Sequence, residues 1–324
     1  MTHAIRIHQT GGPEVLSWEK IEVDKPGRGE VRLRHTAVGL NFIDVYHRSG
    51  LYPIQTPATP GLEAAGIVEE LGDGVGELKV GDRVAYASPP MGAYAEARLM
   101  PADRLVKLPE SISDRQAAAM MLRGMTAQYL LRRTYAVKPK DTILVHAAAG
   151  GVGLIVCQWA KHLGATVIGT VGSDEKAALA KEHGCDFPIV YTREDFVARV
   201  MEITGGAKVD VVYDSVGKDT FLKSLDCLKP LGMMVSFGQS SGSVPPLDLG
   251  LLSAKGSLFL TRPTLMKYTE RREDLLASAR DLFEVVQKGK VKIAINQTYP
   301  LRDAAQAHRD LEARKTTGST VLTI

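Results

Sequence analysis

Short segments of alternating hydrophobic and polar residues fill roughly the first 125 positions of the chain. Glu30-Val-Arg-Leu-Arg34 alternates polar and apolar side chains, as a half-buried strand does. Glycine-rich turns such as Gly72-Asp-Gly-Val-Gly76 and Gly81-Asp-Arg-Val84 separate further strand-like runs. This pattern predicts a compact β-rich domain over residues 1–125.

Beyond this point, short apolar runs alternate with segments of helical periodicity. The apolar runs predict strands at residues 142–146, 166–170, 188–191, 209–213, 233–237 and 257–261. The intervening periodic segments predict helices ending at 163 and covering about 174–183, 194–203 and 220–228. Strands joined by helical crossovers form a doubly wound parallel sheet, so we expect a six-stranded α/β domain over residues 126–265.

The last part of the chain departs from this alternation. Residues 272–288 have the pattern of a long amphipathic helix, and residues 320–324 have that of a strand. We expect this tail, residues 266–324, to return to the first domain.

Charge and composition exclude several classes of protein. The chain of 324 residues has 40 basic and 37 acidic residues, and the Lys and Arg residues are scattered along it. A net charge of +3 without a basic run gives no footprint for nucleic acid or for an anionic membrane. The first residues lack the apolar core of a signal peptide, and no apolar stretch is long enough to span a bilayer. The expected location is the cytoplasm.

The three cysteines, Cys157, Cys185 and Cys227, lie far apart in the sequence. No C-x-x-C pair suggests a zinc site or a redox disulfide. This usage fits a reducing compartment.

The segment His146-Ala-Ala-Ala-Gly-Gly-Val-Gly153 joins the first predicted strand of the α/β domain to its first helix. Glycines allow a tight turn and a close approach of the backbone to a pyrophosphate, and the free N–H groups of the following helix attract the phosphates. A glycine cluster alone could be an ordinary strand-to-helix turn. Because this one opens a six-strand series, it predicts a dinucleotide site at Gly150, Gly151, Val152 and Gly153.

The end of the second strand indicates which dinucleotide is bound. NAD is usually recognised there by an acidic residue, but the strand ends in Thr170-Val-Gly172 and is followed by Ser173 and Lys176. A hydroxyl and an ammonium group suit a 2′-phosphate, which favours NADPH. Asp174 and Glu175 lie in the same turn, and first-turn acids that stabilise a helix are at least as good a reading of them as a cofactor role.

Several motifs together resemble the NADPH-dependent quinone oxidoreductases, the zeta-crystallin-like branch of the medium-chain dehydrogenase/reductase superfamily. They are Asn41-Phe-Ile-Asp44 with Tyr46, Pro60-Gly-Leu-Glu-Ala-Ala-Gly66, Leu78-Lys-Val-Gly-Asp-Arg-Val84, the glycine turn, and Val235-Ser-Phe-Gly-Gln-Ser-Ser-Gly242. The resemblance runs essentially end to end. It implies a GroES-like catalytic domain, an inserted Rossmann domain that binds NADPH, and a homodimer or tetramer.

The zinc alcohol dehydrogenases of the same superfamily are the nearest alternative. They have an early cysteine, a G-H-E motif and a four-cysteine lobe, whereas this chain reads Val38-Gly-Leu-Asn41 and Gly61-Leu62-Glu63 at the first two positions. The run from Tyr86 to Tyr94 passes through the place of the lobe without a cysteine. A catalytic zinc needs about three protein ligands and leucine cannot replace an imidazole, so we expect no metal. Glu63 is then expected to be a structural residue at the domain interface.

Without a metal to polarise it, the acceptor must accept reducing equivalents readily, as a quinone does. An activated enone is a second class of acceptor, for which Tyr46 or Tyr52 could donate the proton. A different possibility is a cofactor-loaded protein that is structural or binds RNA, as some zeta-crystallin-like proteins are. No basic, aromatic-rich surface supports that possibility.

The resemblance also assigns individual residues to the cofactor. Asn41 has two interpretations, since with Asp44 it also resembles the cap of a helix over residues 42–48 that Gly50 ends. His47 and His146 are expected to be structural. The residues assigned to the nicotinamide half are Thr126, Phe237, Gly238, Arg262, Pro263 and Thr264, and those around the pyrophosphate and the adenosine phosphate are Gly151, Val152, Gly172, Ser173, Lys176, Tyr191 and Arg314.

The last predicted strand of the α/β domain, residues 257–261, should lie at one edge of the sheet. An exposed edge with apolar Leu258, Phe259 and Leu260 would aggregate unless it were covered or paired. The resemblance implies a homodimer that pairs this edge with its symmetry mate.

Overall fold

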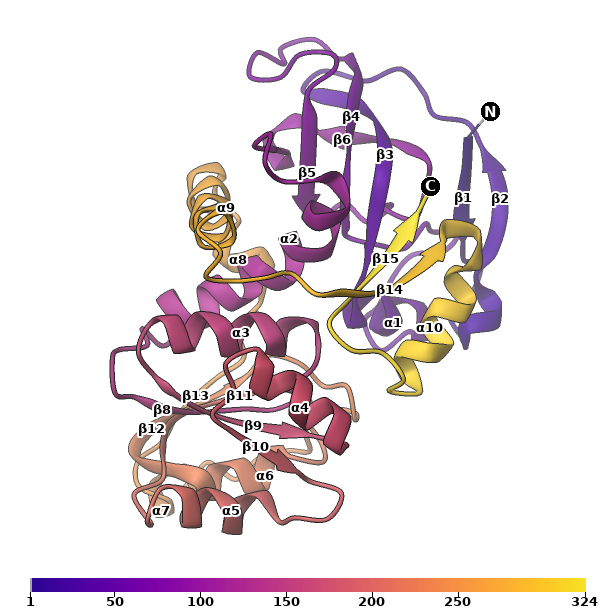
Figure 1. Ribbon diagram of the computed structural model, residues 1–324. Helices are drawn as coiled ribbons and strands as arrows, with labels where there is room; N and C mark the ends of the chain where they lie inside the picture. The colour runs from indigo at the N-terminus through magenta and orange to yellow at the C-terminus, as the bar shows by residue number, and fades with distance from the viewer. Residues whose placement is uncertain (1) are drawn as a thin grey trace. The chain divides into compact units, whose positions relative to one another are not determined.

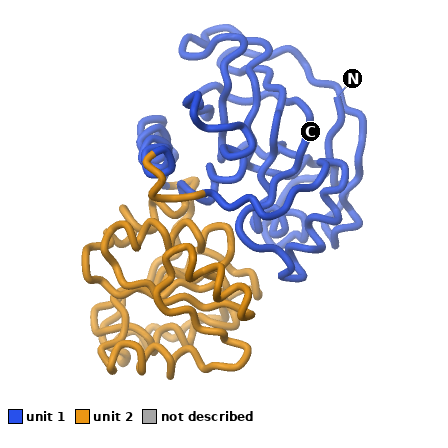
Figure 2. Tube along the Cα trace, in the orientation of Figure 1, with its two compact units in different colours: residues 1–125, 268–287, 293–324 blue, residues 126–267, 288–292 orange. Residues whose placement is uncertain are grey.

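The structure is a computed structural model that describes residues 2–324, and the chain divides into two compact units (Figure 2). Unit 1 contains the residues up to Met125, Tyr268–Gln287 and Ile293–Ile324, and unit 2 contains Thr126–Lys267 and Lys288–Lys292. The division at residue 125 falls inside a helix, α2 (Asp114–Tyr129). It differs from the sequence-based division at residues 266–267 and 288–292, which cluster with unit 2.

Unit 1 is built on an antiparallel sheet with the C-terminal strands at one side. Its strands are β1 (Thr2–Arg6), β2 (Ser17–Ile21), β3 (Glu30–Leu40), β4 (Glu63–Leu71), β5 (Arg83–Ala87), β6 (Ala97–Pro101), β7 (Val106–Lys107), β14 (Ile295–Pro300) and β15 (Ser319–Thr323). The order in the seven-stranded sheet is β14-β15-β3-β4-β5-β7, with β6 paired to β3, and β1 pairs with β2 separately. Strand β15 is antiparallel to β3 and parallel to β14, so the last residues of the chain lie within the sheet.

The helices of unit 1 are α1 (Phe42–Ser49), most of α2, α9 (Arg272–Gln287) and α10 (Ala304–Glu312), with short helical turns at Pro13–Val15, Ala102–Arg104 and Leu301–Asp303. One buried cluster unites the first strands with the C-terminal segment. It includes Ile5, Leu33, Tyr86, Leu301 and Leu322. Burial of apolar surface from both ends of the chain therefore stabilises one core.

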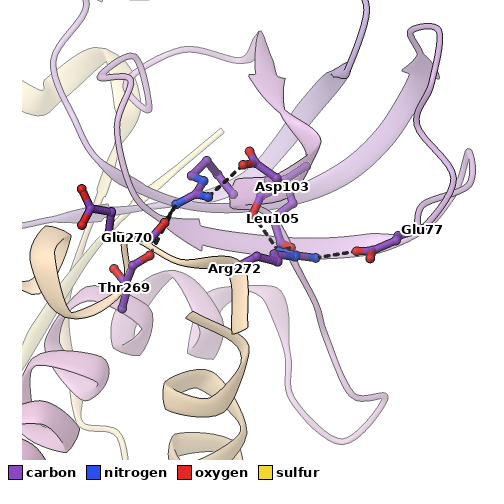
Figure 3. Close-up of polar contacts among 7 residues, drawn as sticks. Glu77, Asp103, Leu105, Thr269, Glu270 and Arg272 are labelled. Atoms are coloured by element: carbon purple, nitrogen blue, oxygen red, sulfur yellow. Dashed lines mark hydrogen bonds and ion pairs between the residues drawn. The ribbon is translucent and has the colours of Figure 1, made fainter. Parts of the chain in front are cut away.

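Two arginines attach the segment before α9 to the rest of unit 1 (Figure 3). Arg272 donates to the carbonyl oxygens of Asp103 (2.9 Å) and Leu105 (2.5 Å) and pairs with Glu77 (3.1 Å). Arg104 donates to the carbonyl oxygen of Glu270 at 3.0 Å. These contacts attach the returning chain to unit 1 at the point where α9 begins.

Unit 2 is a doubly wound parallel sheet, as the sequence predicts. Its strands are β8 (Thr142–Val145), β9 (Thr166–Val171), β10 (Phe187–Val190), β11 (Val209–Asp214), β12 (Leu228–Ser236) and β13 (Phe259–Thr261). The order is β10-β9-β8-β11-β12-β13, and all pairs are parallel. Its helices include α3 (Gly151–His162), α4 (Asp174–Glu182), α5 (Phe196–Ile203), α6 (Phe221–Ser224), α7 (Gly250–Ala254) and most of α8 (Leu265–Tyr268). Helices α3 and α4 cover one face of the sheet and α5, α6 and α7 the other (Figure 1).

Two predicted elements of unit 2 have different bounds in the structure. The helix expected over 220–228 is only one turn, α6, followed by a 3-10 turn at Leu225–Cys227. Strand β12 consequently begins at Leu228, five positions before the predicted start at 233. The extra residues pair with β11 through an irregular register, which a period-based prediction does not detect.

The elements of unit 1 that were not predicted from the sequence include α2, β14 and α10. Strand β14 has no fully buried residue and α10 has three, so neither contains a run of apolar residues that stands out in the sequence. Along residues 2–324, no helix is long and apolar enough to cross a membrane.

Gly39 in β3 occupies a position where a side chain cannot be accommodated. A Cβ atom there would collide with the Glu63 carboxylate and with the carbonyl oxygen of Ala118. We predict that Gly39→Ala lowers the free energy of unfolding by about 1–3 kcal/mol, because buried backbone and a buried carboxylate would have to move. Thermal or urea unfolding measures this loss. The control is Gly76→Ala, where no atom lies within 4 Å of the added Cβ, and equal stability of the two variants would contradict the prediction.

Candidate active site

In unit 2, nearly all the residues predicted to bind the cofactor follow the carboxyl ends of parallel strands. The glycine turn follows β8, Gly172 follows β9, and Tyr191 follows β10. Phe237 and Gly238 follow β12, and Arg262-Pro263-Thr264 follows β13. Parallel strands end at the same edge of a sheet, and the order β10-β9-β8-β11-β12-β13 reverses direction between β8 and β11. Ligands of such sheets bind in the crevice at this reversal.

The glycine turn has the geometry that a pyrophosphate requires. Gly150 is the N-cap of α3, and the first intrahelical bond runs from the Leu154 N–H to the Gly150 carbonyl oxygen (2.9 Å). The N–H groups of residues 151–153 precede that bond, so they have no carbonyl of the helix to pair with. A Cβ at Gly153 would lie 2.7 Å from the Ala148 carbonyl oxygen and would collide with that of Ala147. Glycine at this position therefore allows α3 to lie against the turn.

The second turn joins β9 to α4. Ser173 is the N-cap of α4, and its hydroxyl accepts from the Lys176 N–H at 3.3 Å. The Ser173 hydroxyl also donates to Glu175 and so lowers the pKa of that carboxyl. A Cβ at Gly172 would lie 3.0 Å from the Tyr191 hydroxyl, so the turn passes directly beside the end of β10. The structure thus brings Gly172, Ser173, Lys176 and Tyr191 to one corner of the sheet.

Asp174 does not simply point to solvent, as a first-turn acid of α4 would. Its two carboxylate oxygens accept from the Arg193 guanidinium at 2.6 and 2.7 Å. Arg193 follows Tyr191 by two positions, and the sequence analysis did not identify it. A basic residue just past the end of β10, facing an acidic one just past the end of β9, is the pattern that could have revealed the pair.

The loops after β12 and β13 are held to the sheet by backbone contacts. The Phe237 N–H donates to the Asp214 carbonyl oxygen at 2.8 Å, and a Cβ at Gly238 would lie 2.6 Å from the Ser215 carbonyl oxygen. The Arg262 guanidinium donates to the Ser236 carbonyl oxygen at 2.8 Å. Pro263 is buried and Thr264 is exposed, and Thr126, at the other end of the unit's sequence, is buried in α2.

Asn41, Tyr46, Tyr52 and Arg314 belong to unit 1. Tyr46 is almost completely buried in α1, and its ring lies 5.1 Å from that of Tyr52. The Tyr52 N–H donates to the Tyr46 carbonyl oxygen at 3.0 Å, which holds the following loop against α1. Arg314 lies just after α10, with a left-handed φ of 58°.

Asn41 caps α1, as the sequence predicts. The Asp44 carboxylate accepts from the Asn41 N–H at 2.9 Å, and Gly50 ends the helix in the left-handed conformation. The Asn41 side-chain amide donates instead to Glu63 Oε2 at 2.7 Å. The side chain is therefore also held by the first residue of β4.

Two protein-family models match the chain, one within unit 1 and the other mainly within unit 2. Residues 27–110 match the alcohol dehydrogenase GroES-like domain, and residues 151–279 match the zinc-binding dehydrogenase family. The chain is 54% identical over 323 residues to a quinone oxidoreductase of Pseudomonas aeruginosa, with 99% of each chain covered. The chain belongs to the quinone oxidoreductases of the zinc-binding dehydrogenase family. It also matches the structure of the Escherichia coli quinone oxidoreductase complexed with NADPH, with a TM-score of 0.98, 50% identity and all of both chains covered. A 2-haloacrylate reductase of Burkholderia is 49% identical, with 99% of each chain covered.

This oxidoreductase differs from the zinc enzymes of the family at the position of a zinc ligand. Leu62 lies between Gly61 and Glu63, where the zinc enzymes have the histidine of the G-H-E motif. Among residues 2–324, no group of three or more His, Cys, Asp or Glu side chains could hold a metal ion.

Glu63 is instead the centre of a buried polar cluster of unit 1 that the sequence does not reveal. Its Oε1 accepts from the Leu122 N–H at 2.7 Å, and its Oε2 lies 3.6 Å from the Arg123 guanidinium. Arg123 in turn donates to the carbonyl oxygen of Leu40. The partners of Glu63 come from α2 and from the loop between β3 and α1, so this carboxylate joins three segments far apart in sequence.

A second part of the cluster extends to α10. The Tyr94 hydroxyl donates to Asp44 Oδ2 (3.0 Å) and contacts His308 Nε2 (3.0 Å). Arg48 lies 3.3 Å from His308 Nδ1 and forms a bidentate pair with Glu312, with both distances 2.8 Å. Since an arginine can only donate, His308 Nδ1 accepts and Nε2 carries the proton. The imidazole is therefore neutral.

Burial controls the protonation of this cluster. Desolvation raises the pKa of Glu63 to about 7 and that of Asp44 to about 7, although Arg123 and the hydrogen bonds oppose the shift. Desolvation, with the nearby Arg48 charge, lowers the pKa of His308 to about 3. His146, expected to be structural, is buried between Thr170 and Ser224 with both contacts at 2.8 Å, and burial lowers its pKa.

These shifts predict how the stability depends on pH. Because the pKa of Glu63 rises from its usual 4.5 to about 7 on folding, its contribution is present below pH 4.5 and is lost as the pH rises through 7. In Glu63→Gln this position no longer titrates. We therefore expect the stability advantage of the wild type over the variant to shrink between pH 5 and pH 8, by about 2–3 kcal/mol.

Urea unfolding at several pH values measures the effect. The control is Glu110→Gln, which replaces an exposed carboxylate and should leave the pH profile unchanged. A gap between wild type and Glu63→Gln that is constant from pH 5 to pH 8 would show that the buried carboxyl does not titrate in this range.

Proposed function

We propose that this protein is an NADPH:quinone oxidoreductase that transfers reducing equivalents from NADPH to a quinone without zinc. The observation that carries the proposal is the similarity over the full length to the quinone oxidoreductase complexed with NADPH. The corner formed by the two turns after β8 and β9 fits this cofactor in this chain, because glycines leave room for its phosphates and Ser173 and Lys176 offer polar groups.

The proposed roles in unit 2 follow from chemistry and position. The N–H groups of Gly151, Val152 and Gly153 bind the pyrophosphate at the positive end of α3. Gly172, Ser173, Lys176 and Tyr191 enclose the 2′-phosphate. Arg314 is proposed as a further residue that binds the cofactor. The loops of Phe237-Gly238 and Arg262-Pro263-Thr264 orient the nicotinamide half, together with Thr126.

At the reacting end, bound NADPH supplies the reducing equivalents. We propose that Asn41 contacts the nicotinamide side and that its amide is kept in place by the buried Glu63. Tyr46 and Tyr52 are proposed to contact the acceptor, with Tyr46 held in place by packing against Tyr52 and Phe42. Either phenol could give a proton to the reduced acceptor.

A second candidate is a reductase of activated alkenes. The similarity to a 2-haloacrylate reductase favours it, because that protein's name describes a substrate with a carbon–carbon double bond conjugated to a carboxylate. Such an acceptor requires a proton at carbon after reduction, so it would depend more strongly on Tyr46 or Tyr52 than a quinone would.

We also propose that the protein forms a homodimer, or a tetramer built from two such dimers. Strand β13 lies at one edge of the unit 2 sheet, and its Phe259 and Leu260 are 56% and 37% exposed. An apolar edge of this kind is usually covered or paired. The three cysteines are buried and unpaired, which fits a reducing compartment, and we propose that the enzyme acts in the cytoplasm.

An acceptor screen tests the proposed activity. With NADPH held constant, we expect naphthoquinones and benzoquinones to be reduced faster than enones or 2-haloacrylates, as followed by the loss of NADPH absorbance. Faster reduction of the alkenes would favour the second candidate. Binding of NADPH without turnover of any acceptor would favour a binding protein instead.

Cofactor choice is tested at Lys176. One charge-assisted contact to the 2′-phosphate contributes about 1.5–3 kcal/mol, so Lys176→Ala should weaken NADPH roughly 10- to 150-fold. NADH should be nearly unaffected, because it lacks the phosphate. Steady-state kinetics with both nucleotides measures this, with Lys181→Ala at the other end of α4 as the control. Equal losses for both nucleotides, or a wild-type preference for NADH, would contradict the assignment.

The dimer is tested at the sheet edges. We expect the wild type to sediment as a dimer or tetramer at micromolar concentration, and Phe259→Asp to sediment as a smaller species because two carboxylates would face each other across the paired edge. Phe187→Asp is the control, since Phe187 is 42% exposed on β10 at the opposite edge. A monomeric wild type would contradict the proposal.

A further inference from the structure

The corner proposed to hold the 2′-phosphate contains two acidic residues that oppose such a ligand. Asp174 and Glu175 are the first residues of α4, directly after Ser173 and directly before Lys176. Repulsion from unpaired carboxylates beside a phosphate dianion would weaken its binding. An acidic residue near the end of the second strand is also the feature that recognises the ribose of NAD. The turn therefore contains groups that favour each of the two cofactors.

The structure places Asp174 in a bidentate pair with Arg193. Both carboxylate oxygens are used, at 2.6 and 2.7 Å, so the carboxylate is turned toward the guanidinium. The pair lowers the pKa of Asp174 and raises that of Arg193, which keeps both groups charged and mutually neutralised. Glu175 is likewise engaged, by the Ser173 hydroxyl.

The parallel register of β9 and β10 brings these two charges together. Val190 lies opposite Val171 at the ends of the strands, so the residues after each strand are neighbours. The Thr192 hydroxyl donates to the Gly172 carbonyl oxygen at 3.4 Å, and the Tyr191 hydroxyl lies beside Gly172. The pair of Arg193 and Asp174 continues these contacts, one residue beyond Thr192 on one turn and two residues beyond Gly172 on the other. The ion pair therefore lies next to the residues proposed to enclose the phosphate.

The pair contributes little to the stability of the fold. The Arg193 and Asp174 side chains are 57% and 69% exposed, and ion pairs of this kind are weak in water. The bidentate arginine is better explained by its effect on the electrostatic potential of the turn, because it neutralises the charge of Asp174.

We infer that Arg193 is a positioning residue for cofactor specificity, which binds Asp174 and so keeps that carboxylate from repelling the 2′-phosphate or accepting hydrogen bonds from the ribose. This inference rests on the proposed NADPH-dependent function. It assigns to Arg193 an effect on the choice between NADPH and NADH that acts through another residue.

Binding of adenosine 2′,5′-bisphosphate and of 5′-AMP, measured by calorimetry, tests the inference without turnover. The two ligands differ only in the 2′-phosphate. Arg193→Gln should weaken the bisphosphate by about three- to ten-fold at low salt, with the effect shrinking near 1 M salt. Its affinity for 5′-AMP should not fall. Asp174→Asn should bind the bisphosphate at least as well as the wild type.

The double variant Asp174→Asn with Arg193→Gln decides between the possible causes. If Arg193 acts through Asp174, the double variant binds the bisphosphate as tightly as Asp174→Asn does, to within about two-fold. The reason is that residue 174 then has no carboxylate that could repel the phosphate when Arg193 is lost. If the double variant binds the bisphosphate as weakly as Arg193→Gln, Arg193 contacts the phosphate directly and the inference is wrong. Equal loss of both ligands in Arg193→Gln would show a purely structural role and would also overturn it.

Two comparisons keep this test separate from that of the proposed function. Lys223→Gln breaks the exposed pair of Lys223 with Asp195 in the same unit and should change neither affinity. A wild type that binds both ligands equally would overturn the NADPH assignment and this inference with it. A wild type that prefers the bisphosphate, with a double variant that does not recover, would overturn this inference alone.

Discussion

The parallel direction of the unit 2 strands is the constraint on which the proposed cofactor site depends. Because β8, β9, β10, β12 and β13 run in the same direction, the loops that follow them all emerge at one edge of the sheet. Residues separated by more than a hundred positions, such as Gly150 and Arg262, thereby belong to the same edge. The glycine turn then allows α3 to approach closely enough for its first-turn N–H groups to be available at that edge.

Unit 1 depends on a different kind of interaction, the hydrogen bonds and ion pair of a completely buried carboxylate. Glu63 is completely buried, and it is satisfied by a backbone N–H, the Asn41 amide and the Arg123 guanidinium. Removing one partner from such a group leaves a buried charge or donor uncompensated, which is far more costly than losing a surface contact. Because Gly39 has no side chain, it leaves room for the Glu63 carboxylate. The position that carries a catalytic metal motif in the zinc enzymes thus organises the interior of this one.

The sequence predicted the parts of the molecule that follow from periodicity and turn chemistry. The six parallel strands and the glycine turn were predicted because buried strands and glycine-rich turns have strong local patterns. The pairing of Asp174 with Arg193 was not predicted, because it depends on which strand ends lie side by side. The cluster of Asp44, Tyr94 and His308 was missed for a related reason. Each of these residues looks ordinary in its own segment, and only the tertiary fold brings them together.

The connection between α1 and α10 also has a consequence for the order in which the protein can be completed during synthesis. Arg48 can contact His308 and Glu312 only after 260 or more further residues have been synthesised. Strand β15, which lies between β14 and β3 in the sheet, follows every other strand of that sheet in the sequence. Unit 2, by contrast, is nearly contiguous and has its whole core available earlier. Until β15 has been made, residues 37–40 of β3 therefore lack their neighbour on one side, although the segments that form unit 2 have already been synthesised.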